Sequence, residues 1–244
     1  MIMSTIAHKL QAVATTIQAA SKACGRDPAA VQLLAVSKTF PAAHVLEAIA
    51  AGQHAFGENY LQEALDKIAD IKAAVPAEPV EWHFIGPIQS NKTRPIAASF
   101  DWVHTVERLK VAQRLSEQRP AGMAPLNVCI QVNISGEASK SGAAPGELPE
   151  LARQVALLPN LTLRGLMAIP EPETDAARQR AAFARLRALA DALRAGGLEL
   201  DTLSMGMSAD MAAAIAEGAT IVRVGSAIFG DRSTPISING QPNT

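Results

Sequence analysis

Hydrophobic residues near the start of the chain recur every three to four positions. Ser, Thr, His, Lys and Gln fill the positions between them, so one helical face is apolar and the other is polar. The apolar face contains five residues: Ile6, Leu10, Val13, Ile17 and Ala20. This spacing predicts an amphipathic helix that ends at about Gly25, because glycine is a typical helix terminator.

Beyond this helix, short β-prone runs alternate with longer helical stretches. We predict strands at 31–36, 54–57, 82–85, 101–104, 126–132, 161–168, 201–205 and 220–224. We predict helices at 41–51, 59–73, 90–98, 107–119, 146–158, 174–195 and 208–217. Such alternation indicates parallel strands joined by helical crossovers. Eight units in about 220 residues favour the α/β class with a single closed (β/α)8 TIM-type barrel and an extra N-terminal helix. An open doubly wound sheet is the alternative.

Composition indicates one domain. The chain has 244 residues, 48% of them hydrophobic, which suffices for one well-filled core. We expect a barrel over residues 1–232 and a polar tail over residues 233–244. The 22 basic and 23 acidic residues are spread along the chain and give a net charge of −1, so no nucleic-acid partner is expected. No apolar run reaches the roughly 18–20 residues that a membrane span requires, so no membrane partner is expected either.

The cysteines give a further indication of compartment. Cys24 and Cys129 lie far apart in different sequence contexts, which is typical of a reducing compartment. The first 26 residues lack the continuous apolar segment of a signal peptide. We therefore expect a cytoplasmic protein. We expect no metal site, because neither the two cysteines nor the five histidines have ligand spacing.

The loops that follow the strands build the active site of a barrel of this type. Lys38 follows the apolar run from Leu33 to Val36, so its stem would emerge from the barrel interior with its amine at the mouth. Partial burial lowers the pKa of a lysine and frees its amine for Schiff-base formation. A solvated lysine at the start of a helix is the alternative, and position alone does not decide between them.

The seventh and eighth strands lead into small residues, at the place where barrel enzymes usually bind phosphate. Ser208 is predicted to cap the helix at 208–217, and the free amides of that helix end would suit an anion. Gly225 permits close backbone approach, and Ser226 adds a hydroxyl donor. Taken together with Lys38, these residues indicate a phosphorylated carbonyl compound.

Arg223 is the third element of this candidate site. It alternates with Val222 and Val224, so it would point to the opposite face of the strand, into the barrel. A buried arginine needs a partner, because an unpaired buried charge is very costly. A ring nitrogen of the ligand is one candidate partner, and a carboxylate such as Glu58 or Asp210 is the other.

With these residues, the chain resembles the pyridoxal phosphate homeostasis protein family. Members of this family are small barrels that bind pyridoxal 5'-phosphate (PLP) and are related to the N-terminal domain of alanine racemase. The resemblance covers nearly the whole chain. Its motifs are Ala-Val-Ser-Lys-Thr at 35–39, Phe-Gly-Glu-Asn-Tyr at 56–60, Trp-His-Phe-Ile-Gly at 82–86, Gln-Ser-Asn-Lys at 89–92, Gln-Val-Asn-Ile-Ser-Gly-Glu at 131–137, Lys-Ser-Gly at 140–142, Gly-Leu-Met-Ala-Ile-Pro at 165–170, Leu-Ser-Met-Gly-Met-Ser-Ala-Asp at 203–210 and Val-Arg-Val-Gly-Ser-Ala-Ile-Phe-Gly at 222–230.

The resemblance implies the barrel of PLP enzymes of fold type III, in which Lys38 holds PLP as a Schiff base and Arg223 faces the pyridine nitrogen. It implies four further cofactor contacts: Asn59, Ser208, Gly225 and Ser226. Two positions depart from the family pattern. Phe40 stands where a basic residue is frequent, and Ser226, which keeps the hydroxyl, stands where threonine is common. We expect Phe40 to change access or surface potential more than cofactor binding.

An arginine beside the pyridine nitrogen disfavours its protonation and makes the ring a poorer electron sink. The related racemases also use a second domain and a tyrosine from the opposite subunit, whereas this chain ends shortly after the eighth predicted strand. We therefore expect a monomeric PLP carrier without a catalytic activity of its own. It would act in vitamin B6 homeostasis and meet PLP-dependent apoenzymes transiently.

Two other functions stay open. A small PLP-dependent amino-acid racemase or lyase could use His83, His104 or Tyr60 as a second base, although strand-end histidines are more often polar core residues. A phosphate-binding barrel without PLP could use Lys38 to form a Schiff base with its own substrate. Lys140, in the loop after the fifth predicted strand, is either a second, transient PLP acceptor or a solvated loop lysine.

Overall fold

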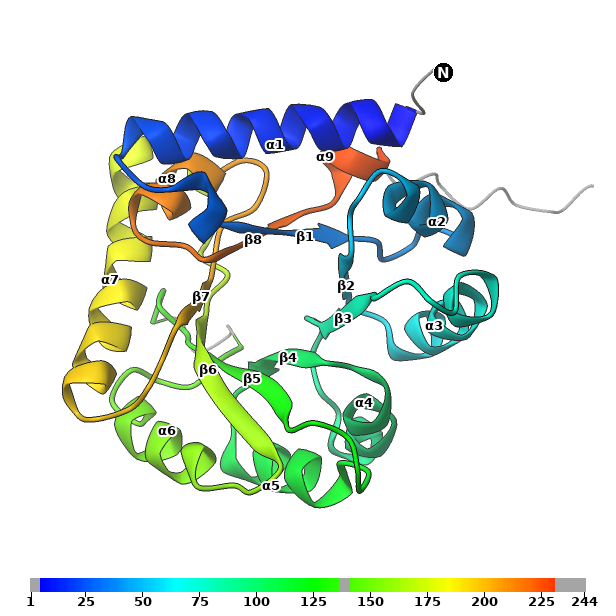
Figure 1. Ribbon diagram of the computed structural model, residues 1–244. Helices are drawn as coiled ribbons and strands as arrows, with labels where there is room; N and C mark the ends of the chain where they lie inside the picture. The colour runs from blue at the N-terminus through cyan, green and yellow to red at the C-terminus, as the bar shows by residue number, and fades with distance from the viewer. Residues whose placement is uncertain (1–4, 137–140, 231–244) are drawn as a thin grey trace, which may run out of the picture.

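The computed structural model describes residues 5–136 and 141–230. Within them, eight parallel strands close into a barrel in sequence order, and β1 pairs with β8 (Figure 1). The strands are β1 Gln32–Val36, β2 Ala55–Glu58, β3 Glu81–Phe84, β4 Trp102–Val106, β5 Leu126–Gln131, β6 Leu161–Met167, β7 Thr202–Ser204 and β8 Ile221–Val224. The predicted barrel is confirmed, and the open sheet is excluded because the two edge strands of such a sheet would not pair.

Helices cover the outside of the barrel (Figure 1). The α-helices are α1 Thr5–Ala23, α2 Ala42–Ala50, α3 Leu61–Ala74, α4 Thr93–Ser99, α5 Leu109–Gln118, α6 Leu148–Ala156, α7 Ala176–Ala195, α8 Met211–Ala216 and α9 Ser226–Phe229. Two short 3-10 helices are η1 Pro28–Ala30 and η2 Ser90–Lys92. Among the described residues, no helix is both long and apolar enough to cross a membrane.

The N-terminal helix covers the outside of the barrel where the first and last strands pair. α1 lies over β1 and β8 and packs against α8 and α9 (Figure 1). Four of the five residues of its predicted apolar face are buried, namely Ile6, Leu10, Val13 and Ile17, and Ala20 is half-buried. The helix ends at Ala23, and Gly25 adopts a φ of 71°, a left-handed conformation that glycine tolerates without strain.

Apolar side chains form two layers, one inside the barrel and one between the strands and the helices. The inner layer fills the barrel with eight residues: Leu34, Val36, Ala55, Ile85, Trp102, Cys129, Met167 and Ile221. The outer layer packs strands against helices and includes Val222 and Val224 of β8. Because successive side chains of a strand point to opposite faces, Arg223 points into the barrel. The predicted orientation of this arginine is therefore confirmed.

The structure differs from the predicted elements in several details, including the ends of most elements and the short helix η1. The predicted helix at 208–217 begins three residues later, at Met211. The predicted helix at 90–98 consists of η2 followed by α4. α9 was not predicted, because a four-residue helix is too short to show a helical period. The polar tail at 233–244 and Lys140 lie outside the described residues.

Candidate functional site

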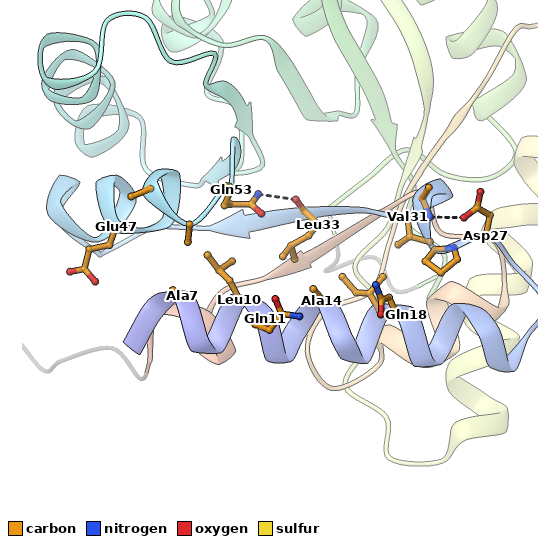
Figure 2. A pocket seen from close by; sticks show the side chains of 16 residues that line it. Ala7, Leu10, Gln11, Ala14, Gln18, Asp27, Val31, Leu33, Glu47 and Gln53 are labelled. Carbon is orange, nitrogen blue, oxygen red and sulfur yellow. Dashed lines mark hydrogen bonds between the residues drawn. The ribbon is translucent and has the colours of Figure 1, made fainter. Parts of the chain in front are cut away.

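Two cavities lie in different parts of the molecule. The larger, about 970 Å³, is a groove on the outer surface between α1, α2 and the start of β1. Figure 2 shows Leu10 and Leu33 beside this groove, with Gln53 Nε2 donating to the Leu33 carbonyl over 3.0 Å. It contains none of the six candidate residues. The candidate site therefore lies in another part of the molecule.

The second cavity, about 580 Å³, lies where several strands end at the C-terminal face of the barrel. All six candidate residues line it: Lys38, Asn59, Ser208, Arg223, Gly225 and Ser226. Val36, Ile85 and Ile169 supply apolar walls. A cavity that combines apolar walls with a lysine, an arginine and several small polar groups is typical of a binding site for a small polar molecule.

Lys38 is half-buried and lies in a tight turn that follows β1. The next residue, Thr39, has a φ of 67°, which is unusual for a residue with a side chain and costs about 1–3 kcal/mol. Two hydrogen bonds hold this turn: the Phe40 amide donates to the Ser37 carbonyl (3.1 Å), and the Thr39 amide donates to Glu63 Oε1 (2.6 Å). The backbone direction at Lys38 is therefore determined by its neighbours.

A buried ionic cluster lies behind this turn. Lys67 Nζ donates to the Ser37 carbonyl at 2.8 Å, to Glu58 Oε1 at 2.6 Å and to Glu63 Oε1 at 3.0 Å. Ser37 Oγ also donates to Glu58 Oε1, over 2.7 Å. Burial raises the pKa of the Glu58 carboxyl, and the Lys67 ammonium opposes this rise. The cluster thus attaches both sides of the Lys38 turn to α3.

Lys67 was not among the predicted site residues. Ala64, Lys67 and Ile71 are the buried residues of α3 and follow each other at spacings of three and four. A lysine on the apolar face of a predicted helix was therefore a visible signal that a buried acid lies nearby. Its acidic partner, Glu58, belongs to β2 and was noted only as a possible partner for Arg223.

Arg223 is 4% exposed and is one of the residues that line the cavity. Nη1 donates to Ser204 Oγ at 2.8 Å and Nη2 donates to the Ala168 carbonyl at 2.9 Å. Burial lowers the pKa of the guanidinium to about 10, so the side chain stays protonated at neutral pH. The proposed ion pairs with Glu58 and Asp210 do not occur among the described residues. Glu58 instead bonds to Lys67.

The phosphate end of the cavity differs from the prediction in one respect. Ser208 is exposed and lies in a turn three residues before α8, so its predicted role as a helix cap is wrong. The new helix α9 begins at Ser226 instead, directly after Gly225. A side-chain Cβ at position 225 would lie 3.1 Å from the Val36 carbonyl oxygen, which crowds β1. Glycine therefore allows β8 to continue into α9 close beside the end of β1.

Two further residues lie at the cavity. Asn59 Oδ1 is buried and has no hydrogen-bond partner within the described parts of the chain, which leaves one acceptor for a ligand. Phe40 lines the cavity and packs against Phe229, with ring centroids 5.3 Å apart. An apolar residue therefore forms part of the cavity wall at this position.

The three candidate second bases, Tyr60, His83 and His104, are not among the residues that line the cavity. Tyr60 is 51% exposed and is absent from the residues that line the cavity. His83 and His104 are fully buried and bond to each other, with His83 Nδ1 and His104 Nε2 2.8 Å apart. Burial lowers the pKa of both imidazoles, so both are neutral at pH 7. The alternative that these histidines are polar core residues agrees with this position.

The fold and the site define a protein of the class built on the barrel of alanine racemase. The family model described as "Alanine racemase, N-terminal domain" matches residues 8–233. Alanine racemase from Corynebacterium glutamicum shares this fold, with a TM-score of 0.66 at 20% identity; the match covers 96% of this chain and 62% of the racemase.

Closer relatives identify the branch of this class. The pyridoxal phosphate homeostasis protein of Pseudomonas aeruginosa is 66% identical over 94% of this chain and 97% of its own length. The protein of the same name from Escherichia coli K12 is 54% identical over 94% of this chain and 98% of its own length. PipY of Synechococcus elongatus, solved with PLP bound, is 38% identical, with a TM-score of 0.80, and the match covers 92% of this chain and all of PipY. The chain belongs to the pyridoxal phosphate homeostasis protein family.

Proposed function

We propose that the chain binds PLP in the cavity at the C-terminal face of the barrel and acts in PLP homeostasis. The observation that supports this most strongly is the convergence of Lys38, Arg223 and the unsatisfied acceptor of Asn59 on one cavity of about 580 Å³. The names of the curated relatives and the PLP-bound structure of PipY support the same cofactor.

Each residue has a distinct task in this proposal. The Lys38 amine condenses with the aldehyde of PLP to a Schiff base and releases one water molecule. Arg223 donates toward the pyridine nitrogen and disfavours its protonation. Gly225, Ser226 and the free amides at the start of α9 hold the phosphate, with Ser208 at the exposed edge. When bound, PLP supplies an aldehyde and an electron-withdrawing ring.

We infer a carrier, not an enzyme. Arg223 keeps its charge at neutral pH and makes the ring a poor electron sink, which removes the main source of carbanion stabilisation. Tyr60 is exposed and is not among the residues that line the cavity, and His83 and His104 are already bonded in the core, so none of the three serves as a second base for a racemase or lyase. A carrier of this kind would release PLP to apoenzymes through the open mouth.

One chain contributes all six proposed contacts, which supports a monomer as the binding unit. The two cysteines are free thiols, with Cys24 exposed and Cys129 buried, which supports a reducing, cytoplasmic setting.

The test uses the purified protein with added PLP, borohydride reduction and peptide mass mapping. We expect a PLP imine band and a reduced adduct on Lys38, both lost in Lys38→Ala and both kept in Lys22→Ala, which removes an exposed lysine of α1. Racemisation or lyase activity on amino acids would restore the enzyme alternative. A wild-type protein that neither absorbs nor retains PLP would favour the barrel that forms a Schiff base with a different substrate.

A further inference from the structure

A line of polar side chains crosses the barrel interior beneath the proposed PLP site. It starts at Glu81 of β3, near the opposite end of the barrel, where the Glu81 side chain is 40% exposed. It continues through His83 of β3, His104 of β4 and Ser204 of β7, each with no solvent exposure. It ends at Arg223 of β8, which lines the cavity. The members come from four strands, although the PLP site needs only the last of them.

Four short contacts connect these side chains. Glu81 Oε1 lies 2.7 Å from His83 Nε2, and His83 Nδ1 lies 2.8 Å from His104 Nε2. His104 Nδ1 lies 2.8 Å from Ser204 Oγ, and Arg223 Nη1 lies 2.8 Å from the same oxygen. Both nitrogens of each imidazole are therefore used within the line.

The chemistry of the two ends determines the direction of every bond. The hydrogen bond from His83 lowers the pKa of Glu81 to about 2, so Glu81 is a carboxylate that only accepts. His83 must then donate from Nε2, and because a neutral imidazole donates once and accepts once, its Nδ1 accepts from His104 Nε2. His104 Nδ1 accepts in turn from the Ser204 hydroxyl.

The other end gives the same direction independently. A guanidinium has only donors, so Ser204 Oγ accepts from Arg223 and its single proton is available for His104. All four bonds thus run one way, from the Arg223 cation to the Glu81 carboxylate, with no donor facing a donor. This agreement between two ends is not required of a random set of buried polar groups.

We propose that Ser204, His104, His83 and Glu81 are positioning residues that hold the Arg223 guanidinium in the orientation needed by the PLP ring. This inference rests on the proposed PLP site. Ser204 is the only member that touches Arg223; the others fix the hydroxyl of Ser204 so that its lone pair, not its proton, faces the arginine. A hydrogen-bond chain of this kind is more rigid than a single contact, because each bond polarises the next.

Packing on the outer members supports the same role. The His83 ring stacks on the Trp102 ring at 5.3 Å with an interplanar angle of 6°, and the Arg164 guanidinium lies 4.7 Å above Trp102. The Ala168 carbonyl, directly after β6, accepts a hydrogen bond from Arg223 Nη2 at 2.9 Å. Arg223 therefore has two fixed acceptors, of which only Ser204 belongs to the line.

The first part of the test needs no PLP. Nitrogen-15 NMR of the PLP-free protein with labelled histidines reports the tautomer of His83 and His104, whose signals are assigned by substituting each in turn. We expect both imidazoles to be neutral at pH 7 and protonated on Nε2, with the Nδ1 signal of His104 shifted in Ser204→Ala. A His104 protonated on Nδ1, or unaffected by Ser204→Ala, would overturn the inference.

The second part compares two variants of similar size and polarity. In His104→Asn, the amide oxygen can occupy the place of Nδ1 and still accept from Ser204. In His104→Gln, the amide nitrogen can occupy the place of Nε2 and donate to His83, but no acceptor faces Ser204. We expect the Kd for PLP to rise about tenfold in His104→Gln and Ser204→Ala, as for the loss of a hydrogen bond to a charged group, and to change little in His104→Asn.

The absorption band of bound PLP gives a second readout that a purely structural role would not change. We expect it to shift in His104→Gln and Ser204→Ala and to match the wild type in His104→Asn. Equal affinity and equal spectra in all four proteins, each shown by circular dichroism to be folded, would overturn the proposal. Absence of the reduced Lys38 adduct from the wild type would instead contradict the proposed PLP site, and the histidine tautomers would still decide whether the polarised line exists.

Discussion

Lys67→Met tests how much the buried ionic cluster behind the Lys38 turn contributes to stability. Methionine keeps most of the volume of the lysine stem but removes the ammonium and its three hydrogen bonds, each 3.0 Å or shorter. Glu58, which has no solvent exposure, then loses its cation and keeps only the Ser37 hydroxyl. The variant therefore leaves one acid buried without a counter-charge.

Removing one partner of a buried ion pair costs roughly 3–5 kcal/mol of unfolding free energy. We expect about 3 kcal/mol at pH 7, because Glu58 can take up a proton and so avoid part of the cost. In the variant, burial raises the pKa of Glu58 with no ammonium to oppose it. Between about pH 4.3 and the raised pKa, the folded protein then binds more protons than the unfolded chain, so stability falls as pH rises through this window, by up to about 1.4 kcal/mol per pH unit.

Urea unfolding at pH 5.5 and pH 8, followed by circular dichroism, measures both effects. Lys72→Met, on an exposed position of the same helix, is the matched control and should lose less than about 0.5 kcal/mol. Adding Glu58→Gln to Lys67→Met should flatten the pH dependence. If Lys67→Met were as stable as Lys72→Met at both pH values, the ion pairs of Lys67 would not stabilise the folded protein, which would contradict this prediction.

Three other outcomes follow from the same structure. Because burial lowers the pKa of His83 and His104, the wild type should lose stability as pH falls below about 6.5, by up to about 1.4 kcal/mol per pH unit for each imidazole, in unfolding titrations between pH 7 and pH 5. Gly225→Ala should cost about 1 kcal/mol in thermal unfolding and raise the Kd for PLP, because its Cβ would lie 3.1 Å from a carbonyl oxygen of β1; unchanged affinity would contradict the close approach. Burial raises the pKa of Cys129 to about 12, so a thiol reagent should modify only Cys24 in the native protein and both cysteines after denaturation.

Local pattern predicted the fold well for a physical reason. Strand and helix periods are properties of neighbouring residues, so the eight strands and the buried face of α1 could be located from the sequence. The start of α8 at Met211 and the short α9 depend on how β7 and β8 approach β1. The local pattern of apolar and polar residues does not show how strands that are distant in the sequence lie next to each other.

The site was predicted in part for the same reason. Alternation along β8 predicted that Arg223 points inward, and the place of Lys38 after β1 predicted that it lies at the mouth. The partners of these two residues were not predictable, because they come from elements that meet only when the barrel closes. Ser204 reaches Arg223 from β7, and Lys67 reaches the Lys38 turn from α3.

These partners show that the lysine and the arginine of the cavity are held in the same way. Lys38 and Arg223 each depend on a separate buried polar network, one anchored by Glu58 and Lys67 and the other running through the barrel interior. Buried polar networks add less stability than apolar packing of the same volume. Their presence directly behind both residues is explained if the orientation of a lysine and an arginine toward one small ligand matters more than the stability that apolar side chains would add.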